Sequence, residues 1–347
     1  AQAQRRKAVS WDDRTQTQDP APYLRKEFTV GKGVKKARIY ITGLGNYELS
    51  LNGQKVGNHV LDPAFTRYDK RVLYVTYDVT QALKKGENAM GVILGNGWYN
   101  ATHISVWGFD QAAWKHRPVL RSQLEIEYED GTRQIVSTDS TWRVAHGPVL
   151  YNNLFLGETY DARKELTGWD GAGYDDSEWK QAEKVQGPEG HTSAQKLPPV
   201  KVIEEITPVS VSEPKPGVFI FDLGVNIAGW VKLTVSGNRG QRIEMTCSER
   251  LSDSGLVDNS DITRFVRAKE VQRDVYILKG DSIETWEPRF TYHGFQYVQV
   301  TGFSGQPTLE NITGKMISTD FDPTGSFECS SSLFNKIQEN TRRSFLS

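Results

Sequence analysis

Several acidic side chains lie close enough together in the sequence to suggest acid–base chemistry. Glu158 and Asp161 stand in GETYDAR, Asp175 and Asp176 in GYDDSEW, and Glu249 in SERL. Cleavage of a glycosidic bond normally needs two carboxyl groups, one to protonate the leaving oxygen and one to attack or to activate water. Acidic residues beside turns more often accept local hydrogen bonds, however, so we expect structural roles for all of them and assign no catalytic residue.

Two of these structural roles can be stated in detail. Asp161 lies two residues before Arg163, which predicts an ion pair at a seam between structural units. Asp175 and Asp176 precede Trp179, which predicts a loop that caps a turn and buries the indole ring.

A different chemistry is indicated by the stretch GNGWYNATHISVWGFDQAAWKHRP, in which two glycines allow a sharp turn and aromatic residues follow. Aromatic faces with amides and a carboxylate could hold a neutral sugar, directly or through Ca²⁺. The opposite interpretation is that the loop folds over a sheet edge and buries its own aromatic rings, and both remain open. The candidate carbohydrate-binding residues are Asn96, Trp98, Tyr99, Asn100, His103, Trp107 and Asp110.

Other classes of site find little support in the sequence. The two cysteines, Cys247 and Cys329, make no disulfide framework, and no Cys/His cluster has zinc spacing, so no metal ligands are assigned. We expect Cys247 to be a small buried residue and His293 to be a hydrogen-bonded histidine of a β-domain. Lysine plus arginine (42) balance aspartate plus glutamate (43), which argues against nucleic acid or a membrane surface as partner.

The elements that must position these residues are strands. In NYELSLNGQKVG, apolar and polar residues alternate up to Asn52-Gly53, a tight hairpin turn. SQLEIEYEDGTRQIV shows the same pattern around Asp130-Gly131. Many short strands at regular spacing predict an all-β protein built from sandwiches or jelly rolls.

The expected organisation is two β-sandwich, jelly-roll-like domains and a short C-terminal helix. Serines 330–332 offer helix caps, and Leu333, Ile337 and Phe345 then recur on one face with Phe334 beside them. Because no helical neighbour is expected for this face, we predict one of three outcomes: self-association into a homo-oligomer through it, exchange of the helix between copies, or a frayed helix. The predicted limits are an arm over residues 1–22, a first sandwich over 23–190, a second over 191–325, and a helical segment over 326–347.

Four motifs, in order, carry a resemblance to a known family: GENAMGVILGNGWYN, GETYDAR, FDLGVNIAGW and WEPRFTYHGFQYV. From about Tyr23 onward the chain resembles the bacterial α-L-rhamnosidases of glycoside hydrolase family 78. The resemblance implies an N-terminal jelly roll, related in some members to a calcium-dependent rhamnose-binding module, and a second sandwich that precedes the catalytic domain. It also implies that residues 326–347 begin an (α/α)₆ catalytic barrel, whose acidic signature D-C-P-Q-R-x-E-R is absent from this sequence.

The resemblance therefore implies the non-catalytic N-terminal fragment of a polysaccharide-degrading enzyme that releases terminal α-L-rhamnose from glycans or glycosides with inversion. Alone, the chain is expected to be inactive and to need no cofactor. The expected partners are the missing catalytic domain of the same polypeptide and a rhamnose-containing oligosaccharide or glycoside. Two alternatives stay open: a rhamnose-binding module, with or without Ca²⁺, and a purely structural scaffold.

The start of the chain, AQAQRRK, suggests a processed secretory protein, because an Ala-x-Ala pattern is typical of signal-peptide cleavage sites. We therefore expect a periplasmic or extracellular location.

Overall fold

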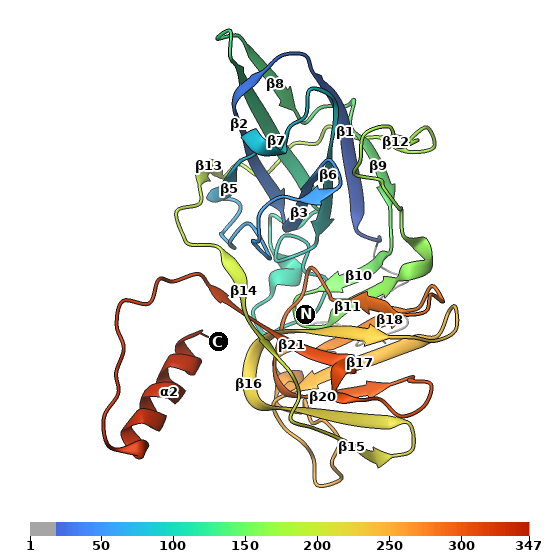
Figure 1. The fold of residues 1–347 in the computed structure, drawn as a ribbon, viewed down its shortest axis with the longest axis vertical. Coiled ribbons are helices and arrows are strands. Elements are labelled where there is room, and N and C mark those ends of the chain that lie inside the picture. The colour runs from blue at the N-terminus through green and yellow to red at the C-terminus, as the bar shows by residue number, and fades with distance from the viewer. Residues whose placement is uncertain (1–18, 269, 347) are drawn as a thin grey trace, which may run out of the picture.

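The computed structural model describes residues 19–268 and 270–346. It is an all-β architecture in which two β-domains stack along the long axis and one helix stands beside the second domain (Figure 1). The predicted fold class, two sandwich-like domains with a short C-terminal helix, is confirmed. Most of the predicted arm over residues 1–22, with the AQAQRRK start, lies outside the described residues.

The first domain is a sandwich of two sheets. The six-stranded sheet has the order β12 (Lys180–Gln181), β9 (Arg143–His146), β1 (Pro22–Val30), β6 (Gly86–Gly95), β3 (Asn46–Leu51) and β4 (Gln54–Lys55). The five-stranded sheet has the order β13 (His191–Ala194), β5 (Arg71–Asp78), β2 (Val34–Leu44), β7 (Val119–Tyr128) and β8 (Arg133–Ser137). Alternate residues of both sheets meet in a core that includes Ile39, Ile41, Val92 and Leu124.

The second domain is a single curled sheet of ten strands. Eight strands follow the order β10 (Val149–Asn153), β11 (Gly157–Asp161), β18 (Arg273–Ile277), β17 (Arg242–Ser248), β20 (His293–Thr301), β16 (Val218–Val235), β21 (Ile312–Thr319) and β14 (Val200–Ile206). The long strand β16 also pairs with β15 (Ser210–Lys215) and β19 (Glu284–Trp286). Short 3₁₀ turns connect some strands: η1 (Thr80–Ala82), η2 (Phe109–Gln111), η3 (Ala162–Lys164), η4 (Ile262–Arg264) and η5 (Leu309–Asn311).

The hairpins and the buried cysteine agree with the sequence. Asn52 and Gly53 have φ values of 54° and 79° and connect β3 to β4, because a tight hairpin turn needs left-handed residues at both positions. Gly131 (φ 80°) closes the predicted turn between β7 and β8. Cys247 is completely buried in the core of the second domain.

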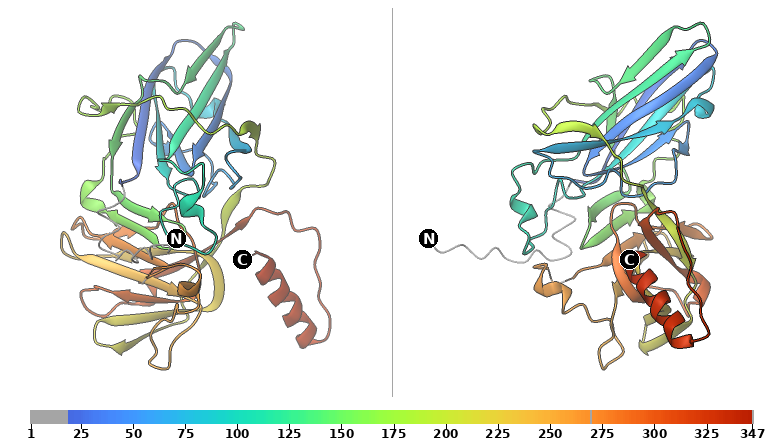
Figure 2. Two further views of the ribbon diagram at one scale, coloured as in Figure 1. Left: turned by 180° about the vertical axis from the view of Figure 1, so that it is seen from behind. Right: turned by 90° about the vertical axis from the view of Figure 1, so that its left-hand side faces the viewer.

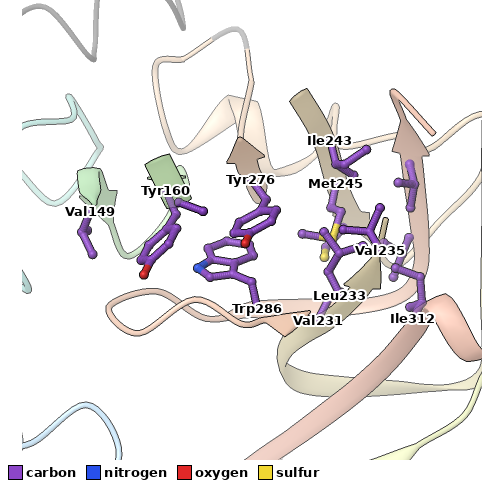
Figure 3. Close-up of a cluster of buried hydrophobic side chains, with 14 of the residues drawn as sticks. Val149, Tyr160, Val231, Leu233, Val235, Ile243, Met245, Tyr276, Trp286 and Ile312 are labelled. Carbon is purple, nitrogen blue, oxygen red and sulfur yellow. The ribbon is translucent and has the colours of Figure 1, made fainter. Parts of the chain in front are cut away.

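The two domains share buried apolar surface. Tyr160, Tyr276 and Trp286 stack on one another inside the second domain, with ring centroids 5.9 Å and 5.4 Å apart for the two neighbouring pairs (Figure 3). The same hydrophobic cluster continues to Tyr23 and Ile93, which belong to strands of the first domain. The boundary between the domains is therefore a packed interface, and a rigid relative placement follows.

The chain passes between the domains more than once. β10 and β11, residues 149–161, lie in the ten-stranded sheet, whereas β12 and β13, which follow them, return to the first sandwich. β11 runs parallel to β18, with Thr159 opposite Val275. The predicted domain limits stay predictions, but the strands of the two domains are interleaved along the sequence.

Helix α2 (Ser332–Leu346) stands clear of both domains except near its end (Figures 1 and 2). Leu333, Phe334, Ile337 and Phe345 are all more than half exposed. The Phe345 ring contacts Phe321 at a centroid distance of 5.6 Å. The predicted homo-oligomer through this face stays a prediction. Among the described helices, none has both the length and the apolar character that crossing a bilayer requires.

A substitution at Gly157 tests whether the entry to β11 is sterically fixed. Its φ is +106°, and an added Cβ would lie 2.0 Å from the Arg273 carbonyl oxygen. We expect Gly157→Ala to lower the free energy of unfolding by about 3 kcal/mol or more, measured by urea denaturation. Gly217→Ala is the matched control, since its φ is +73° but nothing lies within 4 Å; we expect it to cost about 1–2 kcal/mol. Equal losses would contradict the steric argument.

Candidate functional site

The aromatic loop that follows β6 packs most of its rings inward. Trp98 is half-buried and contacts Phe109 and Phe155 at centroid distances of 4.7 Å and 5.3 Å. Tyr99 is buried against the edge of Tyr68 at 5.1 Å. The buried His103 lies 3.0 Å from the Asn153 amide and edge-on to Phe155. These three predicted residues therefore have packing partners within the protein.

Trp107 is different because its side chain is 54% exposed. Its ring stacks with Phe155 and with Phe265 of the second domain, at 5.6 Å and 6.2 Å. Two backbone hydrogen bonds lie beside these stacked rings, from the Val106 N–H to Phe265 O (2.9 Å) and from the Arg267 N–H to Ile104 O (2.8 Å). The loop thus joins the two domains and still offers an exposed aromatic edge.

Three of the candidate residues are polar: Asn96, Asn100 and Asp110. The Asn96 backbone N–H donates to Asn152 Oδ1 (2.7 Å), and its side-chain amide donates to Asn152 O (3.0 Å). Asn100 Nδ2 in turn donates to Asn96 Oδ1 (2.7 Å). Asp110 is buried in η2. The seven predicted residues therefore do not converge on one pocket, and their role in binding stays a prediction. Nowhere in the described chain do three His, Cys, Asp or Glu side chains gather as a metal site requires.

A cavity of about 470 Å³, the seam cleft, lies between the domains. Glu48 and Lys55 line it from the first domain, and Trp230, Glu287 and Arg289 from the second. This cleft was not predicted from the sequence, where Glu48 could only be assigned to the polar face of a strand.

One ion pair, between Arg289 and Glu48, connects the two domains at the seam cleft, and Lys55 of the first domain pairs with the same carboxylate. Arg289 Nε lies 3.2 Å from Glu48 Oε1, and Lys55 Nζ lies 3.1 Å from Glu48 Oε2. Burial alone would raise the pKa of Glu48, but these two cations outweigh it and hold the pKa below its usual value. Glu48 is therefore ionised, and its charge is matched by the two cations on either side.

Glu158, the fully buried glutamate of β11, holds the neighbouring loop in place. Its Oε2 accepts hydrogen bonds from the backbone N–H groups of Arg289 (3.2 Å) and Phe290 (3.1 Å). Phe290 in turn packs against Gly95 of the first domain. Burial raises the pKa of Glu158 to about 8, although the nearby Arg289 opposes the shift. Oε1 has no hydrogen-bond partner among the described residues.

The other singled-out residues have structural roles. Asp161 and Arg163 form the predicted ion pair at 2.8 Å. Asp175 Oδ1 accepts from the Ser177 N–H (3.1 Å) and Trp179 is buried, as expected, while Asp176 pairs with the buried Arg25. Glu249 accepts a hydrogen bond from the Asn226 amide (2.8 Å), which is a structural role as expected. The buried His293 of β20 lies 2.8 Å from Asp274, as expected of a hydrogen-bonded histidine in a β-domain.

Comparison with known proteins gives the family. Residues 32–204 match the model of the α-L-rhamnosidase N-terminal domain, and residues 212–318 match the bacterial α-L-rhamnosidase concanavalin-like domain. The chain belongs to the α-L-rhamnosidase family. An α-L-rhamnosidase of Formosa agariphila is 44% identical over 321 residues, which are 91% of this chain and 34% of that protein.

Solved α-L-rhamnosidases share the fold of this chain over the segment that matches it. The Streptomyces avermitilis enzyme in complex with L-rhamnose superimposes with a TM-score of 0.88 at 41% identity, covering 93% of this chain and 31% of that one. The Aspergillus terreus enzyme gives a TM-score of 0.87 at 34% identity, covering 94% and 37%. The chain thus spans about a third of the length of the curated rhamnosidases it matches.

The raised pKa of Glu158 predicts a particular pH dependence of stability. A glutamate of the unfolded chain releases its proton near pH 4.3, whereas folded Glu158 keeps it until about pH 8. Its contribution therefore falls as pH rises between these values, by about 1.4 kcal/mol per pH unit at most. We expect Glu158→Gln, which cannot titrate, to gain stability relative to the wild type over this range, measured by urea denaturation from pH 5 to 9. Parallel curves for the two proteins would show that the carboxylate is already charged in the fold.

Proposed function

We propose that this chain is the non-catalytic N-terminal region of an α-L-rhamnosidase, and that the whole enzyme releases terminal α-L-rhamnose from glycans or glycosides. The observation that carries the proposal is the match of both β-domains to rhamnosidases about three times as long as the matched segment. In this proposal the two domains support a catalytic domain located elsewhere in the polypeptide.

The chemistry of the described carboxyl groups supports an accessory role. Glycoside hydrolysis needs an accessible acid with a raised pKa and a second carboxylate placed across the bond. Glu158 has the raised pKa but is fully buried. Glu48 and Glu287 are the carboxylates that line the seam cleft, yet Glu48 is held ionised by two cations, and Glu287 accepts the Trp230 indole N–H at 2.9 Å. The glutamate with the raised pKa is therefore not one of the carboxylates that line the cleft.

An activity assay tests this proposal. We expect the purified chain to release no p-nitrophenol from p-nitrophenyl α-L-rhamnoside above the uncatalysed rate, because Glu158, whose pKa is raised, is fully buried and other carboxylates line the seam cleft. A longer polypeptide that includes the family's catalytic domain is the positive control. Turnover by the chain alone that is lost in Glu48→Gln or Glu287→Gln would place the chemistry in the seam cleft and overturn the proposal.

A second candidate function is sugar binding at the aromatic loop, either directly or through Ca²⁺. The exposed edge of Trp107 favours it, since an exposed indole can stack on the C–H face of a sugar ring. Phe265, also about half exposed, stacks with Trp107 and would offer a second ring beside it.

Calorimetry with L-rhamnose tests the second candidate. We expect Trp107→Ala to weaken binding by roughly tenfold, since one aromatic contact contributes about 1.4 kcal/mol. Ile135→Ala, which removes an exposed side chain elsewhere on the first domain, should leave the affinity unchanged. Titrations with and without EDTA separate a direct site from a calcium-dependent one. Equal affinities for Trp107→Ala and the wild type would rule out this platform.

A further inference from the structure

One connecting segment of the first domain, which we call the strap, links its two sheets. It consists of residues 183–190 and leads from β12, at the edge of the six-stranded sheet, to β13, at the edge of the five-stranded sheet (Figure 2, left). Backbone hydrogen bonds anchor its flanks, from the Ala182 N–H to Trp142 O (2.9 Å) and from the His191 N–H to Lys70 O (3.2 Å). The strap is thus fixed at both ends, and most of its residues are exposed.

Beneath the strap lies a cavity of about 1120 Å³, which we call the strap cavity. Ile39 and Ile41 of β2 point into the sandwich core, so Thr42 points to the outer face of the five-stranded sheet, where it lines the cavity. Leu44 and Val72 line it from the same face. Small-molecule sites usually measure about 300–1,000 Å³, so this volume is large enough for more than one sugar ring.

Thr42 is the most informative residue of the strap cavity. Its side chain is only 4% exposed, and its hydroxyl has no hydrogen-bond partner among the described residues. An unpaired buried hydroxyl destabilises a fold, and a partner in the cavity would remove this cost if the hydroxyl turned toward it. One step of χ1 rotation moves the Thr42 hydroxyl into the position that its methyl group or its hydrogen held before, so the hydroxyl can turn toward an occupant.

The rest of the lining indicates which kind of molecule would fit. Leu44, Val72 and Leu94 provide apolar surface. Asn100 provides an amide oxygen that accepts no hydrogen bond from the described residues, because only its Nδ2 is engaged, with Asn96 at 2.7 Å. Acidic and basic side chains nearly balance around the rim, where Arg117 and Asp19 pair at 2.8 Å. A neutral ligand with both C–H and hydroxyl faces matches this surface.

We propose that the strap cavity is a binding site for a neutral saccharide, with Thr42 and Asn100 as hydrogen-bonding groups and Val72 and Leu44 as the apolar floor. This site is separate from the exposed edge of Trp107, and it does not depend on where the catalytic domain lies.

Isothermal titration of the chain with L-rhamnose, and separately with D-glucose, tests the site. Val72→Phe places a ring in the cavity, and we expect it to weaken binding of the recognised sugar by roughly tenfold or more. Thr76→Phe is a control on the same strand and the same outward side, exposed and outside the cavity, and should bind as the wild type does. Because Val72 is buried beside Tyr68 and Tyr99, urea denaturation checks that Val72→Phe is folded under the conditions of the titration. Absence of binding by either sugar, or equal affinity in Val72→Phe and Thr76→Phe, would overturn the proposal.

Thr42→Val gives a second readout that does not depend on enlarging a side chain. Without a ligand, we expect its melting temperature to rise by about 2 °C, because a methyl group replaces an unpaired hydroxyl. With the sugar, we expect affinity to fall roughly three- to tenfold, because one hydrogen bond is lost. A variant that is more stable but binds with unchanged affinity would show that Thr42 does not contact the sugar, and would overturn its assigned role. Heat that is lost in Trp107→Ala but kept in both cavity variants would assign binding to the aromatic loop instead.

Discussion

The arrangement of the two domains depends on one buried carboxyl group. Glu158 Oε2 accepts two consecutive backbone N–H groups, and the two residues that donate them act in different ways. Arg289 extends to Glu48 in the first domain, whereas Phe290 packs against Gly95. A single oxygen atom therefore orients both the polar and the apolar contact between the domains. The carboxyl group can do this in a dry interior because it remains largely protonated at neutral pH.

The aromatic loop has two roles that compete for the same side chains. Its rings were candidates for a sugar platform, but Trp98 and His103 pack on Phe155, and Trp107 stacks with Phe265 across the domain boundary. Such closely packed ring contacts help to keep the two domains in a fixed relative position. In an α-L-rhamnosidase, a fixed pair of β-domains would give an attached catalytic domain a constant surface to pack on.

The sequence was informative wherever short-range patterns determine structure. Alternation and the Asn52-Gly53 turn predicted hairpins, and the apolar neighbours of Cys247 predicted its burial. Contacts between distant segments could not be predicted in this way. Glu48 and Arg289 are separated by 241 positions, and no local pattern marks them as partners. The ring contacts of Trp98 with Phe155 and of Trp107 with Phe265 likewise join segments that are distant in the chain.

The interleaved strands have a consequence for how such a protein can evolve. Because β10 and β11 belong to the ten-stranded sheet although β12 and β13 return to the first sandwich, no single cut in the chain separates the two domains. Recombination of genes would therefore have to transfer both domains together, because a break at any single point would leave strands of one sheet without their neighbours.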